Sequence, residues 1–210
     1  MKRRIVLADD HEIILDGLRR ILEPEFDVIA TVRDGRALVE EIERSKPEVA
    51  VADISMPLLN GLDALYQVKA GNSRTRFVFL TARADVALAT QAFRLGASGF
   101  VLKQAAAEEL ITAIREALAG CTYVTPKIAN EVLQNLMHGG SSGGDGSELT
   151  IREREVLQLL TEGKSLKEAA TVLQVSPRTV EFHKHNIIEK TGLRSTAELV
   201  RYAIRIGLIS

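Results

Sequence analysis

The sequence contains one cysteine, no tryptophan and no long apolar run. The lone Cys121 excludes an intramolecular disulfide, and we expect it to be a small buried or half-buried residue. Because no stretch of about eighteen apolar residues is present, we expect no membrane span. The basic N-terminus passes through only a few apolar residues before Asp9 and Asp10, which is not the pattern of a signal peptide. These absences predict a reduced, cytoplasmic protein with no membrane partner.

Several common binding motifs are also missing. There is no CxxC and no His-rich tract, and neither GxGxxG nor GxxxxGK(S/T) follows a predicted strand, so zinc and nucleotide sites are not expected. The net charge of -1 argues against a general affinity for nucleic acid or membranes. Charge is unevenly placed, because residues 1–137 carry 17 Lys and Arg against 19 acids and residues 148–210 carry 10 against 8. This shift favours a more basic second domain.

The first 120 residues alternate between strand-like and helix-like segments. Short apolar runs predict five strands, at residues 5–8, 27–32, 49–52, 77–81 and 99–103. Helical spacing of apolar residues predicts helices that include residues 11–23, 36–45, 86–95 and 108–119. With a third helix between the strands at 49–52 and 77–81, five strands alternate with five helices, which predicts a doubly wound parallel sheet, an α/β fold.

In such a sheet the functional crevice lies beyond the carboxyl ends of the strands. Asp53 follows the apolar strand at residues 49–52 and is either a satisfied structural group or a reactive carboxylate. The polar residues at the other strand ends are Asp9, Asp10, Thr81 and Lys103. Three carboxylates that come together repel one another, and Mg²⁺ would relieve this while leaving positions for phosphate oxygens. Lys103 would then pair with a phosphoryl group, Thr81 would donate a hydrogen bond, and Asp53 would be the nucleophile.

This constellation resembles the receiver domain of two-component response regulators, with matching residues across almost all of positions 1–120. Met56–Pro57 and Gly61 match the turn that follows the phosphoacceptor strand. The resemblance implies that Asp53 is the phosphoacceptor, Thr81 the switch hydroxyl, and Lys103 the phosphate-pairing ammonium. It also implies that Phe100 is the rotating aromatic residue of the switch. The implied metal ligands are Asp9, Asp10, Asp53 and the backbone carbonyl of Ser55.

The chain departs from the receiver pattern at Gln104, and Ser55 distinguishes it from a second family with a strand-end aspartate. Gln104 stands where many receivers have a proline and a cis bond, so the conformation of the Lys103–Gln104 bond is open. A phosphohydrolase of the haloacid dehalogenase type also uses a strand-end aspartate, but it needs a second Asp two residues later, where this chain has Ser55. Phe100 or Thr81 alone could be an ordinary packed residue, whereas independent packing would not place five such residues at strand ends.

The chain beyond residue 120 reads as a connection followed by helices. We expect a turn at Cys121–Pro126, a helix at residues 127–137 and a flexible Gly/Ser-rich linker at residues 138–147. The predicted helices that follow are residues 151–162, 166–173, 177–191 and a last one from Ser195 to Ile206. Two of them are joined by the short turn Gln174–Val175, which is the form of a helix-turn-helix.

Residues Leu149–Ile209 resemble the DNA-binding domain of LuxR-type regulators, in Leu-Thr-Ile-Arg-Glu-Arg-Glu-Val-Leu and in Ser-Pro-Arg-Thr-Val-Glu-Phe-His. In that family the helix that opens at Pro177 is the recognition helix, and we expect Val180, Ile187 and Ile188 to face the domain core. The candidate DNA contacts are Arg178, Thr179, Glu181, Phe182, Lys184, His185, Lys190 and Arg194. We expect Glu181, Phe182 and His185 to meet base edges. Lys190 could equally be a solvated charge.

With a receiver in front, the whole chain is similar to a response regulator of the NarL/FixJ type. The expected fold is α/β plus all-α: a doubly wound five-stranded parallel (βα)5 receiver domain at residues 1–121, a linker helix and linker at 122–147, and a four-helix helix-turn-helix domain at 148–210. The resemblance implies a phosphorylation-switched transcription factor that catalyses only its own phosphoryl uptake and loss. Mg²⁺ is the implied cofactor.

The implied partners are a sensor histidine kinase, double-stranded DNA, a second copy of the chain when it is phosphorylated, and RNA polymerase. A phospho-independent regulator, or a protein-interaction module that has kept the fold, is the alternative. The intact acidic site argues against that alternative.

Overall fold

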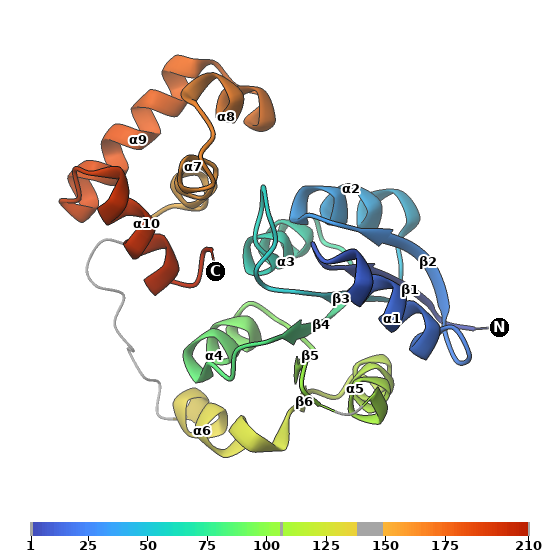
Figure 1. Cartoon of the computed structure of the whole chain (residues 1–210). Helices are drawn as coiled ribbons and strands as arrows, with labels where there is room; N and C mark the ends of the chain where they lie inside the picture. The colour runs from blue at the N-terminus through green and yellow to red at the C-terminus, as the bar shows by residue number, and fades with distance from the viewer. Residues whose placement is uncertain (1, 106, 138–148, 210) are drawn as a thin grey trace. The chain divides into compact units, whose positions relative to one another are not determined.

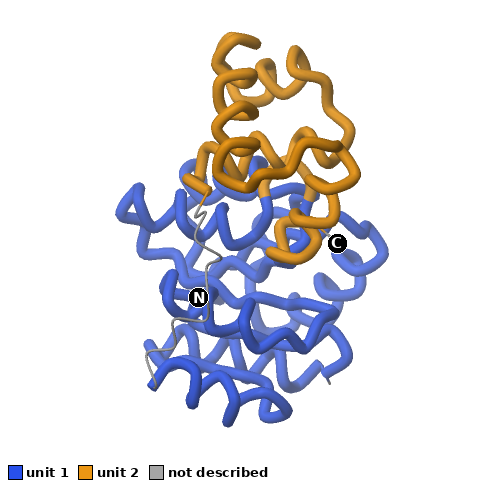
Figure 2. Tube along the Cα trace, turned by 90° about the vertical axis from the view of Figure 1, so that its left-hand side faces the viewer, with its two compact units in different colours: residues 1–56, 60–140 blue, residues 57–59, 141–210 orange. Residues whose placement is uncertain are grey.

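A computed structural model describes residues 2–105, 107–137 and 149–209. The chain forms two compact units, coloured separately in Figure 2: residues 1–56 with 60–140, and residues 57–59 with 141–210. The predicted flexible linker at residues 138–147 lies outside the described residues. Within the part of the chain that is described, no helix has the length and apolar character needed to cross a membrane.

The first unit is built on a parallel sheet with the strand order β2-β1-β3-β4-β5-β6 (Figure 1). The strands are β1 (Arg4–Ala8), β2 (Asp27–Val32), β3 (Val49–Ala52), β4 (Arg76–Thr81), β5 (Gly99–Leu102) and β6 (Tyr123–Val124). All four residues of β3 are buried, as expected for a central strand that is covered on both faces. The predicted doubly wound parallel sheet is therefore confirmed.

Helices follow the strands and cover the two faces of the sheet. They are α1 (Glu12–Leu22), α2 (Gly35–Ser45), α3 (Gly61–Ala70), α4 (Val86–Arg94), α5 (Ala107–Ala119) and α6 (Pro126–Met137). Leu15 of α1 and Ile114 of α5 share one buried cluster with Ile5 and Val51 of the sheet, so these two helices cover the same face. Figure 1 shows α2, α3 and α4 on the other side.

The sheet has one strand more than the five we expected. Tyr123–Val124 forms β6, which pairs in parallel with β5 and places Val124 opposite Phe100. The predicted turn at Cys121–Pro126 is thus partly strand, because two residues are too short a pattern to distinguish from a turn. The same segment corrects the expectation for Cys121, which is exposed.

The helix after β6 belongs to the first unit. α6 packs against α4 and buries Ile128 and Val132, while Leu133 and Met137 on its other side are exposed. The expected receiver boundary at residue 121 therefore falls inside a compact unit that continues through β6 and α6. A helix at residues 127–137 is confirmed, with its start one residue earlier at Pro126.

The second unit is helical and has its own core. Its helices are α7 (Ile151–Thr161), α8 (Leu166–Leu173), α9 (Pro177–Thr191) and α10 (Thr196–Arg205), which confirms the predicted order. Capping boxes open three of them, at Thr150, Ser165 and Ser195, where the side chain of each cap and a Glu three residues later satisfy backbone N–H groups. Gln174 ends α8 in the left-handed conformation with φ 53° and makes the turn into α9.

Candidate functional site

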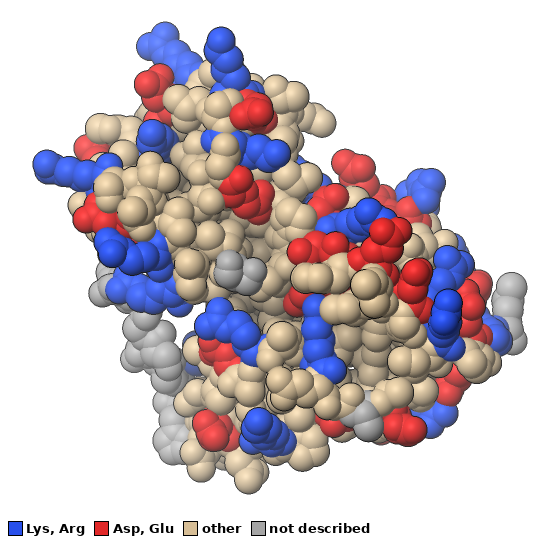
Figure 3. All heavy atoms as spheres, in the orientation of Figure 1, with Lys and Arg blue, Asp and Glu red and all other residues tan. Residues whose placement is uncertain are grey.

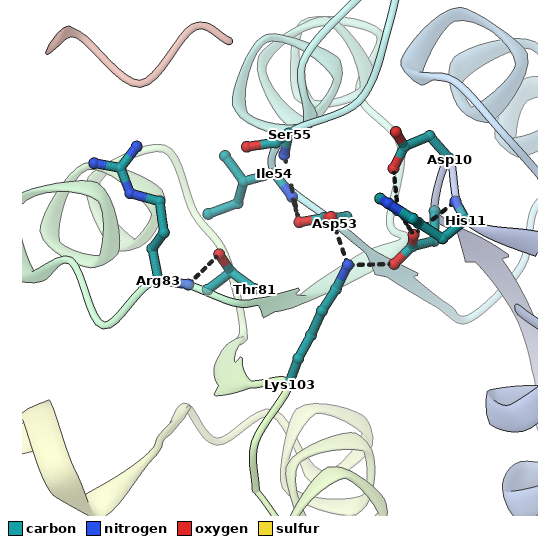
Figure 4. A network of polar contacts seen from close by, with 9 residues as sticks. Asp10, His11, Asp53, Ile54, Ser55, Thr81, Arg83 and Lys103 are labelled. Carbon is teal, nitrogen blue, oxygen red and sulfur yellow. Dashed lines mark hydrogen bonds and ion pairs between the residues drawn. The ribbon is translucent and has the colours of Figure 1, made fainter. Parts of the chain in front are cut away.

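The strand-end residues predicted from the sequence meet at one edge of the sheet (Figure 4). Asp9 follows β1, Asp53 follows β3, Thr81 ends β4 and Lys103 follows β5. Asp9, Asp53 and Thr81 are buried, with exposed fractions of 1%, 7% and 5%. The parallel strands thus bring two carboxylates, a hydroxyl and an ammonium group together from four separate parts of the chain.

Lys103 joins the two buried carboxylates. Its Nζ lies 2.6 Å from Asp53 Oδ2 and 2.6 Å from Asp9 Oδ2. Burial opposes the charge on Lys103, but hydrogen bonds and charges from Asp53 and Asp9 outweigh it and raise the pKa of the ammonium. The side chain therefore stays positively charged in a pocket that also holds two acids.

Asp53 is held by backbone as well as by Lys103. Its Oδ1 accepts a hydrogen bond from the N–H of Ile54 at 2.7 Å and a long one from Ser55 at 3.4 Å. Burial raises the pKa of Asp53 above its ordinary value, against the opposing hydrogen bond and charge of Lys103. Gly61 allows the first residue of α3 to lie directly against the backbone of Asp53, since a Cβ at that position would lie 2.4 Å from the carbonyl oxygen of Asp53.

Asp10 and His11 form the outer part of the acidic site. His11 Nδ1 lies 2.8 Å from Asp10 Oδ1 and 3.2 Å from Asp9 Oδ1, and the His11 N–H donates to Asp9 Oδ1 at 3.0 Å. The charge of Asp10, followed by the hydrogen bond to Asp9, raises the pKa of His11. Ligand atoms of all three residues lie within 4.8 Å of one another. His11 was not predicted from the sequence as a site residue, although it directly follows the acidic pair Asp9 and Asp10.

Two residues are predicted to take part in the switch, Thr81 and Phe100. In Figure 4, Thr81 lies on the opposite side of Asp53 from Asp10. The Oγ1 of Thr81 accepts a hydrogen bond from the N–H of Arg83 at 3.3 Å. Phe100 is fully buried in β5, between β4 and β6. The open question at Gln104 is answered, because the Lys103–Gln104 bond is trans.

In the second unit, α9 presents a polar surface. Val180 and Ile187 are buried, as predicted, and Ile188 is half-buried. Phe182 is 59% exposed despite being the largest apolar side chain on the helix. The other proposed DNA contacts that are exposed are Arg178, Glu181, His185, Lys190 and Arg194, whereas Thr179 and Lys184 are half-buried. Figure 3 shows Lys and Arg side chains over α9 and α10, with a few acids among them.

Two of the proposed DNA contacts have partners within the unit. Lys190 Nζ lies 2.7 Å from Oε2 of Glu153, a carboxylate that is only 3% exposed. His185 Nε2 lies 3.3 Å from Glu189 Oε1, one helical turn away on the exposed face. The structure therefore gives Lys190 an internal role that the sequence did not reveal.

His183 illustrates how closely α9 packs. Its ring meets that of Phe182 edge-on, with centroids 5.6 Å apart. Its Nδ1 is buried and has no hydrogen-bond partner among the described residues.

Comparison with known proteins assigns both units. Residues 5–115 match the family model described as the response regulator receiver domain, and residues 147–203 match the model described as bacterial regulatory proteins, luxR family. The chain belongs to the response regulators. As a receiver joined to a LuxR-type DNA-binding domain, this response regulator regulates transcription in a phosphorylation-dependent two-component system and is not a conventional enzyme.

Relatives of this response regulator extend over its whole length. The oxygen regulatory protein NreC of Staphylococcus carnosus is 36% identical and the match covers 98% of this chain and 99% of the relative. The transcriptional regulatory protein DegU of Brevibacillus brevis is 32% identical, with 99% and 95% covered. Among solved structures, the RcsB response regulator of Salmonella typhimurium is 26% identical, with a TM-score of 0.65 and 98% of each chain covered. RcsB has also been solved bound to promoter P1flhDC in the presence of the phosphomimetic BeF3⁻, with a TM-score of 0.62, 26% identity, and 96% of this chain and 98% of that chain covered.

Proposed function

We propose that Asp53 accepts the phosphoryl group that switches this response regulator. The observation that carries the proposal is the buried Asp53 carboxylate held by Lys103 at the carboxyl edge of the sheet. A histidine kinase is the donor: a carboxylate oxygen of Asp53 forms a bond to phosphorus as the bond from phosphorus to the kinase histidine nitrogen breaks. Lys103 neutralises the charge that develops on the phosphoryl oxygens.

Mg²⁺ is the metal that we propose for the same site. The carboxylates of Asp9, Asp10 and Asp53, with the backbone carbonyl of Ser55, form a set of hard oxygen donors that suits this ion. Asp9 and Asp53 already converge on one cationic group, the ammonium of Lys103, and this convergence supports the binding of a cation there. When bound, Mg²⁺ would offset the repulsion between the carboxylates and the incoming phosphoryl group.

The proposed switch uses Thr81 and Phe100. A phosphoryl group adds about 1.5 to 2 negative charges and three acceptor oxygens. The hydroxyl of Thr81 would turn from the N–H of Arg83 toward those oxygens, and Phe100 would rearrange with the loop that carries Thr81. The phosphorylated form then favours a dimer that binds paired half-sites on double-stranded DNA, where contact with RNA polymerase is a further proposed step.

DNA binding is proposed for the surface of α9 in the domain that starts near residue 148. Glu181, Phe182 and His185 would face base edges. The proposed phosphate contacts are Arg178, Thr179, Lys184 and Arg194. Lys190 was predicted as a fifth contact, and we propose that it serves the ion pair with Glu153 in its place. The exposure of Phe182 supports this assignment, because a large apolar side chain that is 59% exposed on a recognition helix is suited to a thymine methyl group.

The test is phosphoryl uptake by the full chain. Wild type incubated with acetyl phosphate and Mg²⁺ should gain the mass of one phosphoryl group, and Asp53→Asn should gain none, because the amide keeps the shape without the nucleophilic oxygen. Asp16→Asn, at an exposed aspartate on α1, is the matched control and should label normally. Undiminished labelling of Asp53→Asn would reject Asp53 as the acceptor. Asp53→Asn should also abolish any increase in the fraction of dimer that sizing detects after incubation with acetyl phosphate and Mg²⁺.

A further inference from the structure

Thr125 lies at the junction of β6 and α6, and its hydroxyl joins three elements of the first unit. It accepts a hydrogen bond from the N–H of Leu102, the last residue of β5, at 3.2 Å. It also donates a hydrogen bond to Oε1 of Glu109 in the first turn of α5. Thr125 is 6% exposed, so water competes little for these bonds. The end of β5, the start of α5 and the start of α6 therefore meet at one buried hydroxyl.

The side chain of Thr125 takes this position because its backbone carbonyl is used elsewhere. The N–H of Thr125 continues the ladder beyond β6 by donating to the carbonyl of Phe100 at 3.0 Å. Its carbonyl, however, accepts from the N–H of Ile128 at 3.1 Å in the first turn of α6. A buried N–H that lacks an acceptor is costly. The Thr125 hydroxyl supplies the acceptor for Leu102 that a longer β6 would have supplied from its backbone.

The N–H of Leu102 in this hydrogen bond belongs to the residue directly before Lys103. Leu102 precedes Lys103, whose ammonium pairs with Asp53. The N–H of Lys103 donates to the carbonyl of Thr81 on β4 at 2.8 Å. Two successive N–H groups are thus held from opposite sides, that of Leu102 by Thr125 and that of Lys103 by Thr81. Any shift of this segment moves the Lys103 ammonium relative to Asp53.

α6 also has a link to the segment that follows Thr81. It packs against α4 through its buried Ile128 and Val132, and α4 begins at Val86, soon after the end of β4. The connections after β4 and β5 therefore both reach α6, one by apolar packing and the other through the Thr125 hydroxyl. α6 is also the last described element before residues 138–148, through which the chain passes to the helical unit.

We propose that Thr125 is a positioning residue of the phosphorylation site, which fixes the segment that carries Lys103 and makes the start of α6 move with it. The proposal rests on the proposed uptake of a phosphoryl group at Asp53. It makes α6 the output element of the receiver. Thr125 lies outside residues 5–115 that match the receiver family, so this connection is carried by the part of the chain that extends the receiver.

The first test compares phosphoryl uptake by the full chain with and without this hydroxyl. Thr125→Val keeps the shape and removes the hydrogen bonds, so the rate of uptake from acetyl phosphate and Mg²⁺ should fall about 2- to 10-fold. Thr125→Ser restores a hydroxyl and should restore the rate. Thr112→Val is the matched control: it removes an exposed hydroxyl on α5 that bonds to the carbonyl of Glu108 at 2.8 Å, and it should leave the rate unchanged.

The second test asks whether α6 responds to the site. Hydrogen exchange is measured over residues 81–85 and 126–137, with and without beryllofluoride and Mg²⁺. In the wild type both segments should change protection when beryllofluoride is added. In Thr125→Val the change at residues 81–85 should remain and the change at residues 126–137 should be lost. A purely structural role for Thr125 would alter α6 equally in both conditions.

Several results would overturn the proposal. It fails if Thr125→Val takes up phosphoryl groups at the wild-type rate and shows the wild-type change in hydrogen exchange at α6. It also fails if beryllofluoride does not change the hydrogen exchange of α6 in the wild type. If Thr125→Val does not fold, Glu109→Ala replaces it, since loss of the acceptor frees the Thr125 hydroxyl and should slow uptake in the same direction. An unaffected Glu109→Ala would then count against the proposal. A wild type that gains no phosphoryl mass refutes the assignment of Asp53 instead.

Discussion

Replacement of Lys190 by methionine separates two roles for this side chain, a phosphate contact on DNA and an internal ion pair. Methionine keeps the apolar stem and removes the ammonium that lies 2.7 Å from Glu153 Oε2. Glu153 is also the third residue of α7 and the Glu of its capping box, and the same Oε2 accepts from the N–H of Thr150 at 2.7 Å. The ion pair therefore connects the start of α7 to the end of α9.

The expected loss of stability follows from the burial of the two partners. Removing one member of a fully buried pair costs about 3 to 5 kcal/mol, and an exposed pair is worth about 0 to 1 kcal/mol. Glu153 is 3% exposed, but the Lys190 side chain is 36% exposed and is partly screened by water. Since the N–H of Thr150 still serves the carboxylate, we expect Lys190→Met to destabilise the second unit by about 1 to 2 kcal/mol.

Hydrogen exchange in the full chain measures this loss where it occurs. Amides in α7 and α9 that exchange by unfolding of the second unit should exchange about 5- to 30-fold faster in Lys190→Met. Lys167→Met, at an exposed lysine on α8, is the control and should exchange like the wild type. Unchanged exchange in Lys190→Met would refute the ion-pair argument.

Salt dependence of DNA binding supplies the second measurement. A phosphate contact by Lys190 predicts that Lys190→Met lowers the slope of log K against log salt by about one unit. The internal ion pair predicts the same slope as the wild type. A lower slope with unchanged stability would therefore reverse our assignment.

The ion pair also has a pH signature. Burial opposes ionisation of Glu153, but hydrogen bonds from Lys190 and Thr150 hold its pKa below the ordinary value of 4.5. Its folded pKa is lower than its unfolded one, so its contribution to stability is present above about pH 4.5 and is lost as the pH falls through the folded pKa. Lys190→Met should flatten this acid limb of the stability curve of the second unit. An acid limb as steep as that of the wild type would contradict the assigned cause.

Four other positions described above give further testable outcomes. Glu181→Ala should raise affinity for random DNA and relax selection at one base pair by about 1 to 3 kcal/mol, whereas Arg178→Ala should lower the salt slope by about one unit; selection from random oligonucleotides and salt titration check them. Gln174→Gly should stabilise the second unit by about 0.5 to 1 kcal/mol in thermal unfolding, because φ 53° strains a side chain, whereas Gln174→Ala should give no gain. Asp10→Ala should raise the Mg²⁺ concentration needed for half-maximal phosphoryl uptake, and an unchanged requirement would remove Asp10 from the metal site.

The sequence predicted well that Asp9, Asp53 and Lys103 lie together at the carboxyl ends of the strands, because this placement depends on strand periodicity. Asp53 and Lys103 each follow a short apolar run, and a parallel sheet places the ends of such runs together. Helix starts in the second unit were equally predictable, since a capping box such as Thr150 with Glu153 is a local signal. These features need only residues that are close in sequence.

Features that depend on distant residues could not be predicted in the same way. β6 is two residues long, and only its pairing with β5 makes it a strand. The ion pair of Lys190 and Glu153 joins residues 37 positions apart, so Lys190 looked like a solvated charge or a phosphate contact. Thr125 is part of no sequence motif. Its role depends on the hydrogen bond that its hydroxyl accepts from the buried N–H of Leu102, 23 residues away in the sequence.

β6 and α6 determine where a stable receiver fragment must end. A fragment that stopped at residue 121 would turn β5 into an open edge strand and uncover the apolar side of α4 on which Ile128 and Val132 pack. Unpaired N–H and C=O groups along such an edge are a template for pairing with another molecule. A receiver prepared for phosphorylation assays should therefore extend through Met137, and the shorter fragment should self-associate at concentrations at which the longer one stays monomeric.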